Sequence, residues 1–163
     1  MTTVSMGYGT PVAMTVTNLN NLANSATAGW QSARVDNKSS EMAMAYQIDV
    51  EIALANTAAA NDKCVYVFMV PWFYDGSTWH AGADGGTTTY PAGTEGTYTI
   101  AAGNSLVPLM VIPYVATQQV VHKACQINQP PDGFSLVIIN YSGAAIAGSG
   151  NSVNYKPIHY TSA

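Results

Sequence analysis

The segment from Met44 to Leu54 constrains the fold more than any other part of the chain. Its apolar residues occupy every second position, at Tyr46, Ile48, Val50, Ile52 and Leu54. Polar or small residues fill the positions between them. Because the side chains of a β-strand alternate between its two faces, this pattern predicts a strand with one buried face and one wet face.

A second segment, Lys63 to Phe73, is apolar at nearly every position and predicts a central strand buried on both faces. Pro71 is expected to end the hydrogen-bond ladder of this strand or to lie at a bulge. Shorter apolar or alternating segments are bounded by residues that favour turns. They are expected at 12–16, 97–100, 106–115, 118–127, 134–140 and 152–160. Residues 18–33 contain four Asn and Gly29, which favour a loop with at most one helical turn.

These segments amount to about seven or eight short strands without a convincing helix. They predict an all-β fold, an antiparallel β-sandwich whose simplest topology is a jelly roll. A length of 163 residues suits one domain. We expect a single sandwich domain at residues 18–163, preceded by an N-terminal segment, residues 1–17, that is a candidate interaction arm. The alternative is that residues 1–17 supply an ordinary first strand of the same domain.

Charged residues make up only 9% of the chain, against about 25% in a typical globular protein. Five Lys and Arg residues are too few to form a phosphate-binding stripe, so we expect no nucleic-acid partner. No apolar run is long enough to span a membrane, and residues 1–17 do not resemble a secretory signal, so we expect no membrane partner. Cys64 and Cys125 are expected to be reduced thiols, with a disulfide between them as the alternative.

The sequence contains no recognisable catalytic motif. His80, His122 and His159 are isolated, and no metal-binding spacing of His or Cys occurs. Asp49 and Glu51 share one face of the predicted strand at a spacing that could serve a glycosidase. We interpret them instead as the polar positions of an amphipathic strand. We therefore expect no enzymatic activity, no catalytic residue, no metal and no cofactor.

Five aromatic residues gather around the Gly- and Thr-rich stretch at 75–96: Trp72, Phe73, Tyr74, Trp79 and Tyr90. Such residues can belong to the core, form a protein interface or stack against sugar rings. We take Trp79 and Tyr90 as candidate partner contacts. Met6 and Tyr8 are further candidates, because an uncharged and partly β-prone arm could add a strand to a neighbour's sheet edge.

Four segments, taken in order, resemble one group of proteins. They are residues 32–37 (SARVDN), 46–54 (YQIDVEIAL), 63–68 (KCVYVF) and 137–145 (VIINYSGAA). In these segments the chain is similar to small virion structural proteins of tailed bacteriophages. The resemblance implies a jelly-roll or related β-sandwich fold and a non-enzymatic role in the virion, with assembly in the cytoplasm of the bacterial host.

Within that group, the resemblance most simply implies a capsid decoration protein, also called a cement protein. Such a protein binds the outside of the shell, and its partner there is the major capsid protein. Capsid symmetry favours a homotrimer. Two alternatives stay open: a neck or tail component of the virion with the same fold, and a carbohydrate-binding module that uses the loop of Trp79 and Tyr90.

Overall fold

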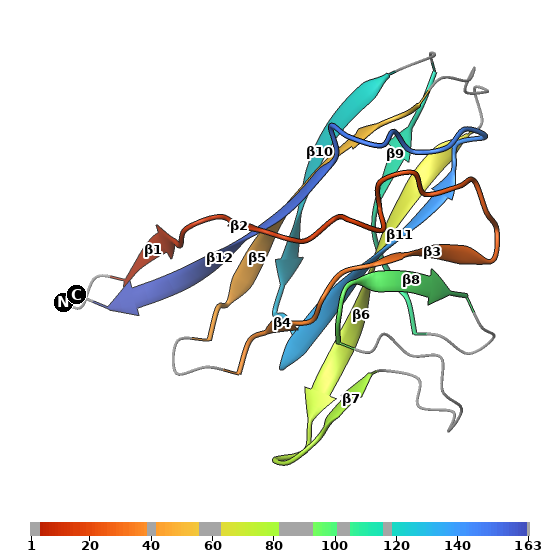
Figure 1. Ribbon diagram of the computed structural model, residues 1–163. Coiled ribbons are helices and arrows are strands. Elements are labelled where there is room, and N and C mark those ends of the chain that lie inside the picture. The colour runs from red at the N-terminus through yellow and green to blue at the C-terminus, as the bar shows by residue number, and fades with distance from the viewer. Residues whose placement is uncertain are drawn as a thin grey trace.

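Two antiparallel β-sheets, packed against each other, form the fold (Figure 1). The computed structural model describes residues 4–38, 42–55, 63–81, 93–100, 105–115 and 119–162. All regular secondary structure in these ranges is strand, and none of them contains a helix that could cross a bilayer. The strands are β1 (Val4–Tyr8), β2 (Val12–Ala13), β3 (Ala28–Gln31), β4 (Val35–Asp36), β5 (Ala45–Ala53), β6 (Cys64–Tyr74), β7 (Trp79–Ala81), β8 (Gly96–Thr99), β9 (Val107–Pro113), β10 (Val120–Asn128), β11 (Gly133–Tyr141) and β12 (Ser152–Ser162).

One sheet has the strand order β1-β12-β5-β10, and β2 pairs with β12 beside β1. The other has the order β7-β6-β11-β3-β8, with β4 paired to β11 and β9 paired to β6. Every one of these pairs is antiparallel. The predicted all-β, antiparallel sandwich is therefore confirmed. The strand order does not establish a jelly roll, so that topology stays a prediction.

The main core lies between the two sheets. The alternating apolar residues of β5 point into it and meet β6 and β11 from the other sheet. The ring of Tyr46 contacts the ring of Phe134 edge-on, with centroids 5.0 Å apart. β11 is buried on both faces, because Val137 and Ile139 pack into a second cluster on the far side of its sheet, where they meet Trp72.

Three sequence-based expectations need correction or refinement. Residues 28–31 form a strand, although residues 18–33 were expected to be a loop, because β3 pairs with both β8 and β11 and buries Trp30. Pro71 interrupts the ladders of β6 on one edge only, and β6 continues through it. On one side of β6 it is paired with Phe134, while on the other side the ladder with β9 stops at Met69 and the ladder with β7 begins at Trp72. Proline, which lacks an N–H, therefore occupies a position where no described strand on that side pairs with it.

Short strands account for the other difference, because the described residues contain twelve strands rather than seven or eight. The strands that raise the count are short, such as β3, β4 and β7, with two to four residues each. Pairing partners distant in sequence hold them in place, and a local pattern does not reveal such partners.

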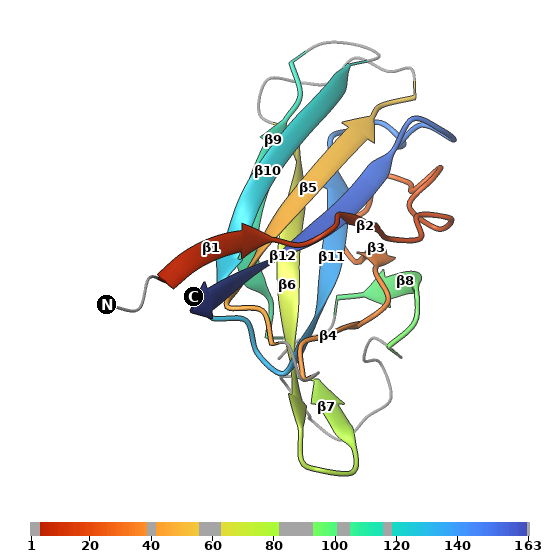
Figure 2. The same ribbon diagram turned by 90° about the vertical axis from the view of Figure 1, so that its left-hand side faces the viewer.

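Two parts of the molecule project from the sandwich (Figures 1 and 2). One is a two-stranded ribbon formed by β1 and the C-terminal half of β12, near which both chain termini lie. We call it the terminal ribbon. The other is the hairpin formed by the end of β6 and β7, drawn at the bottom of both views. We call it the β6–β7 hairpin.

Candidate interaction surfaces

The terminal ribbon forms where β12 outruns its neighbour β5. The pairing of β12 with β5 ends at Ile158 and Ala45, and beyond that point β12 pairs only with β1. Gly9 follows directly after the end of β1. Its N–H donates to the carbonyl oxygen of Pro157 at 2.8 Å. A Cβ at this position would lie 2.7 Å from Cγ of Pro157, so the close approach of the two segments favours glycine.

Apolar side chains gather on one face of this ribbon. Met6 lies opposite Tyr160 and Tyr8 lies opposite Ile158, and Val4 follows on the same face because side chains repeat every second residue. Val4 is 65% exposed, Met6 49%, Tyr8 54% and Tyr160 57%. No charged residue belongs to β1, and Nζ of Lys156 lies 4.9 Å from the centroid of the Tyr8 ring. The ribbon thus presents an apolar, almost uncharged surface to solvent.

The candidate acid pair, Asp49 and Glu51, lies on the outer face of the same sheet. Asp49 is hydrogen-bonded to Nε2 of His122 on the neighbouring strand β10, while Glu51 is opposite His122 in the register. Asp49 also borders an open pocket of about 300 Å³ together with Asn154 and Lys156. Both carboxylates therefore occupy polar positions of an amphipathic strand, and Asp49 has an imidazole as its partner.

The β6–β7 hairpin carries an aromatic cluster on one of its faces. Tyr74 and Trp79 are directly opposite each other, and their ring centroids lie 5.0 Å apart. The guanidinium of Arg34 sits over the Trp79 ring at 4.1 Å and over the Trp72 ring at 5.2 Å. The ammonium of Lys38 lies 3.4 Å from the centroid of the Tyr74 ring. Two of the five basic residues of the chain thus stack on this face of the hairpin and fix it to the segment around β4.

Trp79 is accordingly part of an internal cluster. Its ring is half-buried, and Gly133 fits against it because a Cβ there would lie 2.9 Å from Cζ3 of the indole. Ring atoms that are covered in this way are not free to stack on a partner. Sequence reasoning did not find this arrangement, because Arg34 and Trp79 are far apart along the chain.

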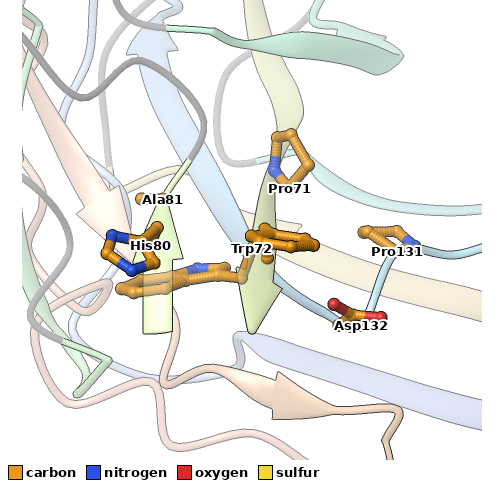
Figure 3. A pocket seen from close by; sticks show the side chains of 7 residues that line it. Pro71, Trp72, His80, Ala81, Pro131 and Asp132 are labelled. Carbon is orange, nitrogen blue, oxygen red and sulfur yellow. The ribbon is translucent and has the colours of Figure 1, made fainter. Parts of the chain in front are cut away.

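The opposite face of the hairpin is open. Phe73 and His80 are paired across β6 and β7, and the Phe73 side chain is 62% exposed. Beside them lies a pocket of about 380 Å³ (Figure 3). Its lining residues are Pro71, Trp72, Phe73, His80, Ala81, Pro131 and Asp132. Figure 3 shows His80 on one side of Trp72, with Pro131 and Asp132 on the other.

Hydrogen bonds hold the polar rim of this pocket in place. Nε2 of His80 lies 2.9 Å from Oδ2 of Asp75, and Oδ1 of Asp75 accepts the backbone N–H groups of Ser77 and Thr78. The His80 contact, followed by the two backbone donors, holds the pKa of the Asp75 carboxyl well below its usual range. Across the pocket, Oδ2 of Asp132 accepts the N–H of Tyr74 at 3.0 Å.

The remaining predicted positions are as follows. Tyr90 lies outside the described residues. Both cysteines are free thiols, and burial raises the pKa of Cys125 to about 11. Among the described residues, His80, His122 and His159 do not come together, and no group of three or more His, Cys, Asp or Glu side chains could hold a metal ion.

Comparisons with known proteins add little to this geometry. No family model matches the sequence, and no curated protein matches it. A chain from the solved structure described as "Structure of infectious bursal disease virus Gx strain" aligns with 99% of this chain at 14% sequence identity and a TM-score of 0.20. The present chain spans 40% of the length of that chain. A similarity with so low a TM-score carries no argument about fold or function.

Proposed function

We propose that this chain is a non-enzymatic structural protein of a tailed-bacteriophage virion, and most simply a capsid decoration or cement protein. In this proposal it binds the major capsid protein on the outside of the shell, after assembly in the cytoplasm of the host. The resemblance of the four sequence segments supports the group. The observation that carries the proposal is the terminal ribbon, with four exposed apolar side chains on one face.

The ribbon has the properties of a docking element rather than of a solvated strand. Exposed strands of monomeric proteins are commonly protected by charged side chains, which oppose pairing with other chains. β1 has no such charge, and its apolar side chains would gain burial on contact with a partner. Its outer edge can also offer backbone groups to a neighbouring strand.

The proposed mechanism is a clamp that acts through many copies. Each copy, as part of a homotrimer, contacts adjacent capsid subunits through the ribbon. Each contact adds a modest interface area. Because separating the subunits would break several such contacts together, the copies raise the cost of opening the shell by avidity. The low charge of the surface lessens repulsion between closely packed copies.

Copy number in purified particles tests this proposal. Quantitative mass spectrometry against the major shell protein is expected to find on the order of hundreds of copies per particle. About a dozen copies per particle would contradict a decoration role and favour the alternative, a neck or tail component. Complete absence from the particles would overturn the virion proposal.

A paired variant tests the role of the ribbon itself. Met6→Ser combined with Tyr160→Ser should abolish attachment to particles without preventing folding, because both side chains are exposed. Tyr141→Ser is the matched control, since Tyr141 is an exposed aromatic residue on β11, away from the ribbon. If the paired variant binds particles as well as the control does, the ribbon is not the attachment site.

A further inference from the structure

The open face of the β6–β7 hairpin combines an apolar floor with a polar rim. Phe73 is exposed, and it lines the pocket together with two prolines, Pro71 and Pro131. At the rim, one oxygen of Asp132 is bound to the N–H of Tyr74, and its other oxygen has no hydrogen bond with any described residue. A concave site with few polar groups over an apolar surface is the usual form of a small-ligand pocket, and about 380 Å³ is enough for a sugar ring.

The charges at this pocket disfavour anionic ligands. None of the seven residues that line it is Lys or Arg. The carboxylates of Asp132 and of Asp75, the partner of His80, would repel a phosphate, a sulfate or an acidic sugar. A neutral ligand avoids this repulsion.

The backbone pairing of β6 leaves that strand unable to accept a peptide by strand addition at Trp72. Trp72 on β6 is paired with Gly133 of β11 on one side and with Ala81 of β7 on the other. No edge of β6 is therefore free at this position to accept an additional strand. A ligand seated over β6 is therefore recognised by side chains, through contact with an aromatic ring and hydrogen bonds at the rim.

From these constraints we propose that the pocket beside Phe73 binds a neutral pyranose ring, as a terminal or internal unit of a glycan. The apolar C–H face of the sugar stacks on the Phe73 ring, whose negative π face favours the weakly positive C–H groups. A sugar hydroxyl donates to the second carboxylate oxygen of Asp132, because a carboxylate accepts hydrogen bonds through both of its oxygens. This binding activity is separate from the virion proposal and differs from a site at Trp79, whose ring is occupied by Arg34.

The hairpin is well supported for such a role. On its other face, Arg34 and Lys38 stack on Trp79 and Tyr74, and these contacts restrain the strands that present Phe73. At its tip, the turn of Asp75 fixes the start of β7. Because the site has little conformational freedom to lose, ligand binding there carries a smaller entropic cost.

An array of neutral and acidic glycans, probed with the isolated full chain, tests the proposal. We expect a subset of the neutral glycans to capture the chain. We expect no glycan to capture it through an acidic sugar unit. For a bound sugar, Phe73→Ala should weaken binding by about tenfold or more, and Asp132→Asn should weaken it by a smaller factor. Tyr141→Ala, which removes an exposed aromatic ring at the other end of β11, should leave binding unchanged.

Three results would overturn the proposal. They are the absence of any captured neutral glycan, equal capture by Phe73→Ala and wild type, and binding of proline-rich peptides in place of glycans. Thermal unfolding of each variant separates lost binding from lost folding. Because the assay uses the isolated chain and no particle, its failure would leave the virion proposal untouched, and the reverse also holds.

Discussion

β11 and β1 are both antiparallel strands, yet their side chains meet opposite environments. β11 pairs with β6 on one edge and with β3 and β4 on the other, and eight of its nine residues are buried. Among the described strands β1 pairs with β12 alone, and four of its five residues are exposed. Both strands form ladder hydrogen bonds, β11 on two edges and β1 on one, so they differ in backbone pairing as well as in side-chain burial.

This comparison separates the part of the protein that holds the fold from the part that is available to partners. Backbone hydrogen bonds replace bonds to water and contribute little net free energy, whereas apolar burial contributes about 25 cal/mol per Å². β11 therefore belongs to the stable centre. The apolar side chains of β1 are still exposed, so they would gain burial only on contact with a partner. This property suits a docking element.

The largest expected effect is that of removing a side chain from β11. Ile138→Ala should lower the free energy of unfolding by about 3 kcal/mol, because Ile138 is completely buried in the main core and the substitution leaves a cavity. Met6→Ala in β1 should change it by less than about 0.5 kcal/mol. Urea unfolding followed by circular dichroism measures both. Similar losses for the two variants would contradict the division drawn between these strands.

The second effect concerns the two places where a cation stacks on aromatic rings. Arg34→Met should lower the unfolding free energy by about 1 kcal/mol, because Arg34 is half-buried and contacts two indole rings. Lys156→Met is the matched control in the ribbon, where Nζ lies over the exposed ring of Tyr8. Lys156→Met should lower the unfolding free energy by less than Arg34→Met does in the same assay. A larger loss for Lys156→Met would contradict the expectation that the stacked cation of the hairpin stabilises the fold more than that of the ribbon.

Burial also explains which strands could be predicted from the sequence. Strands β5 and β6 follow from local patterns that extend over nine residues or more, and β11 follows from a shorter apolar run, Leu136 to Ile139. β3 did not, because its four residues lie among Asn and Gly and are held by β8 and β11. A strand defined by distant partners leaves little trace in its own composition.

The candidate surfaces follow the same rule. Met6 and Tyr8 could be chosen from an uncharged, β-prone segment, and the structure exposes both, while their contact with a partner stays a prediction. Trp79 was chosen as an aromatic residue near a loop, but its burial depends on Arg34, Lys38 and Gly133, which come from other segments. Phe73 and Trp79 are both aromatic residues of the hairpin, but they lie on opposite faces of it. The pairing of β6 with β7 determines these faces, and the sequence alone does not predict that pairing.

A smaller effect is expected when β1 is removed altogether. Deletion of residues 1–10 should leave a cooperatively folding sandwich, because β12 keeps its ladder with β5. The thermal midpoint should fall by only a few degrees, in line with a loss below about 1 kcal/mol. Attachment to particles should be lost if the ribbon is the docking element. A deleted chain that no longer folds would show that β1 belongs to the structural centre after all.

The smallest effect concerns the tip of the β6–β7 hairpin, which is as exposed as β1 but is held by polar contacts. The folded-state pKa of Asp75 is lowered, chiefly by His80 and then by the N–H groups of Thr78 and Ser77. The stabilising contribution of this carboxylate is therefore fully present above its unfolded pKa of about 3.9, and it is lost as the pH falls through the lower folded pKa. Asp75→Asn should accordingly be slightly less stable than wild type at pH 6, and this difference should shrink on acidification below about pH 4. Because both partners are solvent-exposed, added salt should weaken the difference as well. Urea unfolding of the two proteins across this pH range measures it, and a difference that grows towards low pH would show that the contact with His80 does not lower the pKa of Asp75.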